Sequence, residues 1–182
     1  MIFHLFRRQP QDDSIASLYG MIVAQGRAPA FYQHYGVPDT VNGRFEMIVL
    51  HLVLVLSRLK SEPDGPRKLG QGVFDLFCRD MDANLREMGV GDLAVPRTMQ
   101  GMGAAFYGRQ AAYEAAFAAA EPGALAAALA RNVFGGEAGP NAVRLAAYVR
   151  DTIHGLAAQD GAALSRGELR FPRPEDVRGG EA

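Results

Sequence analysis

The fold of this chain is decided by residues 28–60, which read APAFYQHYGVPDTVNGRFEMIVLHLVLVLSRLK. Within this stretch nine of the ten residues from Met47 to Leu56 are apolar, and the exception is His51. A helix that is apolar on every side belongs in a core, with other helices packed around it. The β-branched residues in the run also fit a buried strand, but the chain holds no second strand-like run to pair with it. We therefore predict an all-α domain, a single compact multi-helix domain around a central apolar helix at about residues 45–59.

Length and composition limit what kind of protein this is. The chain has 182 residues, which suits one domain, and 48% of them are apolar, as in ordinary globular proteins. The net charge of −1 argues against the broad basic surface of a nucleic-acid-binding protein, so we expect no nucleic-acid partner. Cys78 is the only cysteine, so no intrachain disulfide forms, which fits a reducing compartment.

The N-terminal residues and the longest apolar run bear on localisation. The uncharged run from Met47 to Ser57 has 11 residues. A helix needs ~20 apolar residues to span a bilayer, so we expect no membrane-spanning helix. Residues 1–8 (MIFHLFRR) place apolar residues before two arginines, which is the reverse of a secretory signal. We interpret them either as a weak peripheral contact with an anionic membrane surface or as a terminus that packs on the domain. The expected location is cytoplasmic. If residues 1–8 contact lipid, the protein is expected at the cytoplasmic face of the inner membrane.

Helical periodicity and turn residues divide the rest of the chain. Apolar residues recur at steps of three and four, and turns rich in glycine and proline separate the segments. We expect further helices at residues 14–27, 29–35, 67–88, 96–119, 122–134 and 141–158, and a loose turn or short extension over 164–171. All linkers are short, so the simplest account is one helical domain over residues 12–171. An N-terminal segment (1–11) precedes it, and a charged, disordered tail (172–182) follows it.

Candidate catalytic and metal-binding groups are sparse. The four histidines are scattered, and none has the spacing of a zinc site. Asp80 and Asp82 are two residues apart, so a helix points them in different directions. Cys78 lies inside a predicted helix, away from any helix N-terminus that would lower its pKa. We expect no catalysis, no metal and no cofactor, and we interpret His51 as a core histidine that bonds a buried group and fixes helix register.

The helices on both sides of the turn at residues 89–92 carry the one compositional signal for binding. Methionine adapts its shape and is over-used on surfaces that accept varied apolar partners. Methionines and phenylalanines with aspartates beside them predict an apolar groove with an acidic rim, suited to a hydrophobic client with basic loops. The alternatives are a core between two helices and a salt-bridged face with Asp75–Arg79 and Asp82–Arg86 pairs. The residues concerned are Phe74, Asp75, Phe77, Asp80, Met81, Asp82, Met88, Met99 and Met102.

A second candidate surface lies in the aromatic segment before the central helix. Phe31, Tyr32 and Tyr35 are interpreted as exposed aromatics that face a partner. Asp39 and Arg44 flank the turn that leads into the helix, and we expect them to hold that turn by a salt bridge or a helix cap. These two residues therefore have a predicted structural role.

Several segments, in this order and at these spacings, carry a resemblance to a known family. The first spans residues 19–59 and contains RAPAFY, YGVPDT and GRFE before an apolar helix with a histidine. The second, residues 74–109, reads FDLFCRDMDANLREMGVGDLAVPRTMQGMGAAFYGR. RNVF, LAAYVR and LSRGELRFP follow at residues 131–134, 145–150 and 164–172. Together these segments cover nearly the whole chain, and the chain resembles the ubiquinol–cytochrome c chaperone family.

The resemblance implies an assembly chaperone for the cytochrome bc1 complex. Such a protein binds a newly made hydrophobic subunit, cytochrome b or another bc1 subunit, without catalysis and without a cofactor. Mitochondrial members work with a partner chaperone near the translating ribosome and the inner membrane. The sequence shows no transit peptide, so we expect the bacterial, cytoplasmic form. The alternatives from the residues alone are a general helical protein-binding module and a haem- or small-molecule-binding protein.

Overall fold

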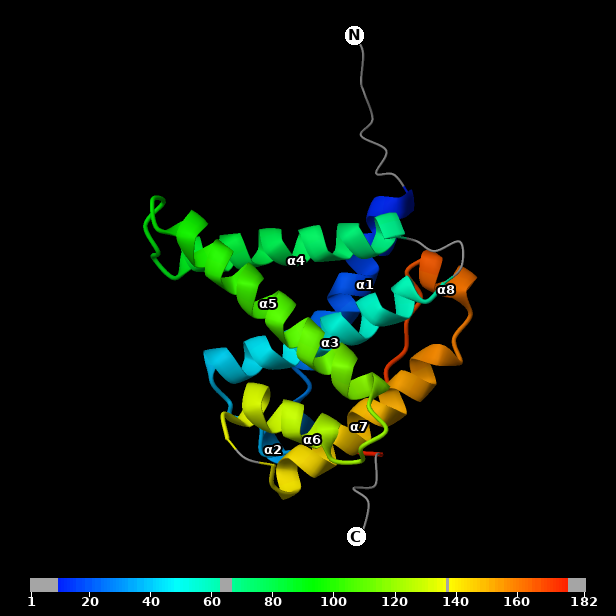
Figure 1. Cartoon of the computed structure of the whole chain (residues 1–182). Helices are drawn as coiled ribbons and strands as arrows, with labels where there is room; N and C mark the ends of the chain where they lie inside the picture. Colours follow the sequence, from blue (N-terminus) through cyan, green and yellow to red (C-terminus); the bar gives the residue numbers. More distant parts are fainter. Residues whose placement is uncertain (1–9, 63–66, 137, 177–182) are drawn as a thin grey trace.

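Helices form all of the regular secondary structure in the computed structural model, which describes residues 10–62, 67–136 and 138–176 (Figure 1). The helices are α1 (Pro10–Gly26), α2 (Pro29–Gln33), α3 (Val41–Lys60), α4 (Arg67–Glu87), α5 (Val95–Ala118), α6 (Ala124–Leu129), the π-helical turn η1 (Ala130–Phe134), α7 (Pro140–Ala157) and α8 (Gly161–Ser165). The prediction of an all-α fold is confirmed.

The predicted and observed boundaries differ most at three places. α3 begins four residues before the predicted start, because Thr40 caps it: the Thr40 hydroxyl accepts a hydrogen bond from the Gly43 amide at 3.1 Å. The helix predicted over residues 122–134 changes to π-helical geometry at Ala130. The loose turn or short extension predicted over 164–171 corresponds to residues 166–171, but the prediction missed the short helix α8 before it, which Asp160 caps.

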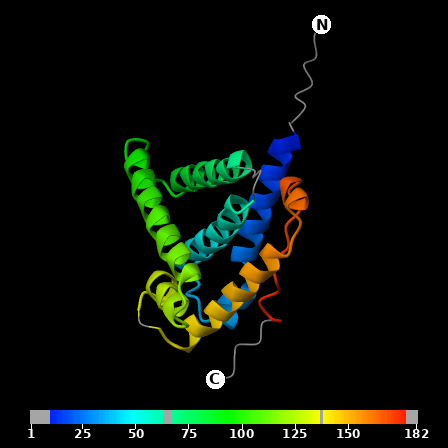
Figure 2. The ribbon, with the colours of Figure 1, turned by 45° about the vertical axis from the view of Figure 1, so that its right-hand side comes forward.

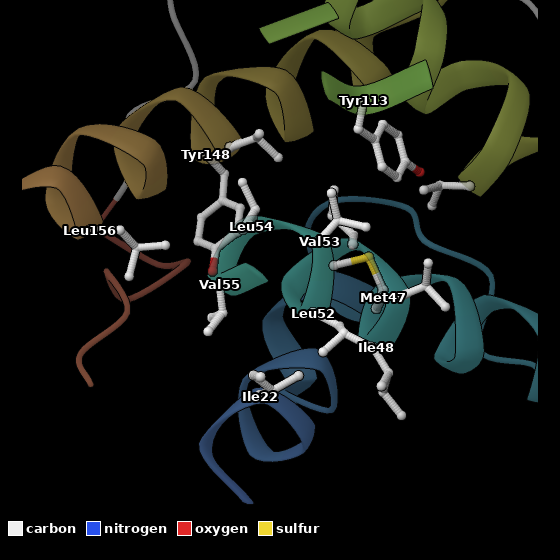
Figure 3. Packing of buried hydrophobic residues seen from close by; sticks show 14 of the residues in the cluster. Ile22, Met47, Ile48, Leu52, Val53, Leu54, Val55, Tyr113, Tyr148 and Leu156 are labelled. Atoms are coloured by element: carbon white, nitrogen blue, oxygen red, sulfur yellow. The ribbon is translucent and has the colours of Figure 1, made fainter. Parts of the chain in front are cut away.

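α3 is the centre of the domain, with α5 on one side of it and α1 with α7 on the other (Figure 2). Every residue from Glu46 to Val55 is buried. Side chains of α1, α5 and α7 converge on this run, among them Ile22, Tyr113 and Tyr148 (Figure 3). Each fully buried Val or Leu stabilises the fold by roughly 1.5–3 kcal/mol relative to exposure. The prediction of a central apolar helix is confirmed.

α4 and α5 form a helical hairpin that packs along α3, with Gly70 near Leu56 and Leu59 and with the turn of the hairpin near the N-terminal end of α3. The chain reverses at Gly89, whose φ of +83° lies in the left-handed region, and the Val90 amide donates to the Leu85 carbonyl at 3.0 Å. This is the usual glycine termination of a helix. At the other end of α3, Arg58 donates from Nε to the Leu156 carbonyl and from Nη2 to the Gln159 carbonyl, both at 2.8 Å. The Arg58 guanidinium thereby binds one carbonyl in the last turn of α7 and one just after it, where carbonyls lack the usual i+4 amide partner.

The segment after α8 packs back on the start of the domain. Gln25 Nε2 donates to the Pro172 carbonyl at 3.1 Å, and the Tyr35 hydroxyl donates to the Pro174 carbonyl at 2.6 Å. The predicted start of a disordered tail at residue 172 is therefore too early. The remainder of that predicted tail (177–182), and residues 1–8 with their predicted membrane contact, lie outside the described residues. Over the described ranges, no helix is both long enough and apolar enough to cross a bilayer.

We predict that Gly43→Ala destabilises the fold. A Cβ at this position would lie 2.0 Å from the Pro38 carbonyl oxygen, so the turn before α3 would have to move. We expect the free energy of unfolding in urea to fall by about 1–3 kcal/mol, as in other overpacked sites.

Gly101→Ala in α5 is the matched control for this prediction. A Cβ at Gly101 would meet no heavy atom within 4 Å, so alanine at this helical position should stabilise the protein by up to about 1 kcal/mol. Equal effects of the two substitutions would show that the Pro38–Gly43 contact does not constrain the turn.

Candidate functional site

A groove with a volume of about 690 Å³ lies between the first turns of α3 and the last turns of α4. Its apolar lining consists of Val41, Phe45, Ile48, Met81, Leu85, Met88 and Met102, the last from α5. The floor belongs to the core, because Ile48 is 4% and Met81 8% exposed. The walls stand in solvent, because Val41 is 75% and Met88 60% exposed. The groove is thus an open apolar surface on a packed base.

The rim of this groove is basic rather than acidic. Its polar residues are Arg27, Asn42, Arg44 and Asn84. Arg44 Nε donates to Asp39 Oδ1 at 2.7 Å, and the Arg44 guanidinium lies 5.8 Å from the centre of the Tyr32 ring. Arg27 forms no ion pair within the part of the chain that the structure describes. The prediction of an acidic rim is therefore wrong for this groove, and the expected salt bridge between Asp39 and Arg44 is present.

The three predicted rim aspartates lie on other faces of α4. Asp80 Oδ2 accepts a hydrogen bond from the Tyr19 hydroxyl at 2.6 Å, and burial together with this bond raises the pKa of Tyr19 well above its usual value. Asp82 pairs with Arg86 at 2.7 Å.

Asp75 accepts from Gln71 Nε2 at 2.7 Å, and the predicted Asp75–Arg79 pair is not formed among the described residues. The reason for these placements is helical geometry. Each residue turns the side-chain direction by about 100°, so neighbours of Met81 point away from its groove.

The predicted groove residues divide into two sets. Met81, Met88 and Met102 line the groove. Phe77 is buried between α4 and the core. Phe74 is half-buried, with its ring centre 4.8 Å from that of Phe106, and Met99 is half-buried against the core. The second set corresponds to the alternative in which these residues fill the space between two helices.

The second candidate surface is largely internal. Phe31 and Tyr35 are buried, so the prediction that they are exposed is wrong. The Phe31 ring lies edge-on to Tyr148, with centres 4.9 Å apart. Tyr32 is half-buried, and its hydroxyl donates to the Gly26 carbonyl at 2.6 Å. The aromatic rings of this segment therefore fix α2 to the core and do not face a partner.

His51 is fully buried and has a partner at each ring nitrogen. Nδ1 lies 2.7 Å from the Met47 carbonyl, and Nε2 lies 2.9 Å from the Tyr148 hydroxyl. A carbonyl only accepts, so Nδ1 carries the proton and Nε2 accepts from Tyr148. The Tyr148 oxygen in turn accepts from Gln25 Nε2 at 2.9 Å. The bonds run in one direction from α1 through α7 to α3, and burial keeps His51 neutral by lowering its pKa.

A buried ion pair that the sequence analysis missed joins α3 to α5. Arg109 Nε donates to Glu46 Oε2 at 2.5 Å, and Arg109 Nη2 donates to Glu46 Oε1, which makes the pair bidentate. The Glu46 side chain is 1% exposed and that of Arg109 22%. An acid at the edge of an apolar helix was the only sequence signal, and it does not identify a partner 63 residues away.

The groove is the feature of the described chain best suited to binding. No group of three or more His, Cys, Asp and Glu side chains in those residues is placed to hold a metal ion. An open apolar surface with a polar rim is typical of a site for another protein. Fold and groove together define a helical domain with a surface suited to apolar protein segments.

Comparison with known proteins identifies the family. The ubiquinol–cytochrome c chaperone family model matches residues 33–171, and the chain belongs to this family. A crystal structure of the Cbp3 homolog from Brucella abortus resembles the fold with a TM-score of 0.85 and 40% sequence identity, over 98% of this chain and 100% of that one. The ubiquinol-cytochrome-c reductase complex assembly factor 1 of Xenopus laevis is 26% identical over 136 residues, which are 74% of this chain and 68% of the relative. The family predicted from the sequence is confirmed.

We predict that Arg109→Met destabilises the domain strongly. The substitution leaves the Glu46 carboxylate buried without a counter-ion, so we expect a loss of about 3 kcal/mol in the free energy of unfolding. The double replacement Glu46→Leu with Arg109→Met should recover most of that loss, since no charge stays buried. A loss below about 1 kcal/mol for the single variant would mean that water compensates the carboxylate.

We predict that stability falls as pH drops through the range set by His51. Burial lowers the pKa of His51 from 6.5 to about 4. The unfolded chain therefore takes up this proton first, and the contribution of neutral His51, about 3 kcal/mol, is present above pH 6.5 and lost towards pH 4. The free energy of unfolding, measured in urea at several pH values in this range, should change more steeply with pH for the wild type than for His51→Gln.

The matched control for the pH experiment is His154→Gln, because His154 is exposed near the end of α7. This variant should keep the wild-type slope. Identical slopes for the wild type and His51→Gln would contradict the assignment of the pH dependence to His51.

Proposed function

We propose that this chain is an assembly chaperone for the cytochrome bc1 complex that holds a newly made hydrophobic subunit, cytochrome b, without catalysing a reaction. Membership of the ubiquinol–cytochrome c chaperone family supports the assembly role, as does the name of the Xenopus laevis relative, a complex assembly factor. The observation that carries the client-binding part is the methionine-lined groove between α3 and α4.

The chemistry of the groove fits an apolar client. Burying apolar surface contributes roughly 25 cal/mol per Å², and the lining offers three methionines with branched and aromatic side chains. Methionine has an unbranched, polarisable side chain, so it can fit apolar segments of different shapes. A membrane protein presents several such segments in turn as it is made. Adaptable contacts therefore suit this client better than a rigid pocket.

The methionines of the groove differ in burial, and this difference supports a stable base with an adaptable wall. Met81 is nearly buried and belongs to the base of the groove, while Met88 follows the last turn of α4 and is largely exposed. The base is held by the packing of α3 against α4. The wall can change rotamer without disturbing that packing, because few atoms surround Met88. A client can thus be accepted without unfolding of the chaperone.

The same proposal predicts where in the cell the protein acts. A client that enters the inner membrane is met at the cytoplasmic face of that membrane. A peripheral contact of residues 1–8 with the membrane remains a prediction, because these residues lie outside the described structure.

We predict that deletion of the gene lowers mature bc1 complex and cytochrome b, measured by immunoblot and haem absorbance, while other respiratory enzymes stay near normal. The wild-type gene should restore both. The variant with Val41→Lys and Met88→Lys should fold but restore little, because two charges on exposed groove walls oppose the entry of an apolar segment.

Val143→Lys is the matched control for this complementation. Val143 is 51% exposed on α7 and does not line the groove, so its replacement should restore the complex fully. Normal bc1 levels in the deletion strain would overturn the assembly role. Full complementation by the double lysine variant would overturn the groove as the client site.

A further inference from the structure

The groove has two arginines on one edge, where the end of α1 meets the start of α3. Arg27 and Arg44 line both the groove and an adjoining depression that includes Tyr32 and Asp39. Both arginines are exposed. A segment that lies in the groove therefore passes within reach of two guanidinium groups.

The charges on this edge do not cancel. Arg44 is held by Asp39 and by the Tyr32 ring, which leaves that pair neutral and in place. Arg27 has no acidic partner among the described residues. Asp80, on the neighbouring face of α4, already accepts a hydrogen bond from Tyr19 and does not line the groove. One positive charge thus remains available at the rim.

The walls of the groove favour a helix as its occupant. Val41, Phe45 and Ile48 follow each other on α3 at the spacing i, i+4, i+7. Met81 and Leu85 on α4, with Met88 directly after its last residue, repeat this spacing. Two such apolar stripes side by side form the type of groove into which an amphipathic or apolar helix lays its own stripe. An apolar segment made for a membrane is also helical, because helix formation satisfies its backbone groups.

We infer that the groove selects apolar helical segments that carry a carboxylate next to the apolar run, and that Arg27 recognises this carboxylate. The inference rests on the proposed function, since it specifies the client segment that the chaperone takes. A guanidinium donates two parallel hydrogen bonds to a carboxylate. The rim amides of Asn42 and Asn84 add polar groups that tolerate such a neighbour. A basic residue at the same place meets like charge and is disfavoured.

The test uses the full-length chain and three fluorescent helical peptides of about 15 residues, the length at which alanine-rich helices form. The peptides share one apolar stripe and differ only in a flanking Glu, Gln or Lys. We expect the Glu peptide to bind roughly two- to fivefold more tightly than the Gln peptide, and the Lys peptide to bind most weakly. Fluorescence anisotropy gives the Kd values.

Three further measurements identify the arginine. The preference for Glu over Gln should disappear in Arg27→Gln and in about 1 M salt, where charges are screened beyond roughly 3 Å. It should persist in Arg131→Gln, because Arg131 is exposed on η1 and does not line the groove. Circular dichroism of both variants checks that the fold is retained.

The outcomes separate the inference from the proposed function. Equal binding of the three peptides would overturn carboxylate selection while leaving an apolar client site in place. Binding that survives Val41→Lys with Met88→Lys would put the peptides elsewhere and overturn the inference, as would a failure of all three to bind. The assembly role is decided separately, by bc1 levels in the deletion strain.

Discussion

Burial of α3 on every side is the constraint on which the structure depends. Ten consecutive residues, Glu46–Val55, are removed from solvent, and a single neighbouring helix can cover only one face of them. The chain therefore surrounds α3 with α1, α4, α5 and α7. Apolar contact is not directional, however, and would allow these helices to slide. The two polar residues in the run supply direction, because Glu46 binds only where Arg109 is and His51 bonds only where Tyr148 is.

The groove is a product of the same arrangement. α4 covers the first half of α3 incompletely. The apolar side chains of the two helices therefore continue from the core to the surface, where they end at Val41 and Met88. The buried residues that stabilise the base and the exposed residues that can meet a client thus lie on, or directly after, successive turns of the same two helices. This continuity explains how a chaperone can expose apolar surface and stay folded: the exposed part is short and the part below it is fully packed.

The sequence predicts the helices well and the surface poorly. The apolar run and the regular spacing on α4 are local signals, so the central helix, the hairpin and the methionine groove follow from them. The rim does not, because Arg27 follows α1 and Arg44 lies on α3, so neither belongs to the pattern on α4, and both meet the α4 residues only in the folded chain. Phe31 and Tyr35 lie in a segment too short for a periodic pattern, so their burial has no sequence signal.

The segment after α8 forms contacts with earlier parts of the chain that can close only late in synthesis. The Pro172 and Pro174 carbonyls accept hydrogen bonds from Gln25 and Tyr35, and Gln25 also bonds Tyr148. Residues near both ends of the described chain thus meet in one layer. During synthesis this layer stays open until the ribosome has released residues 172–174. α1 packs on α3 and α4 without this segment, so the hydrogen bonds to Pro172 and Pro174 complete the layer late and do not start it.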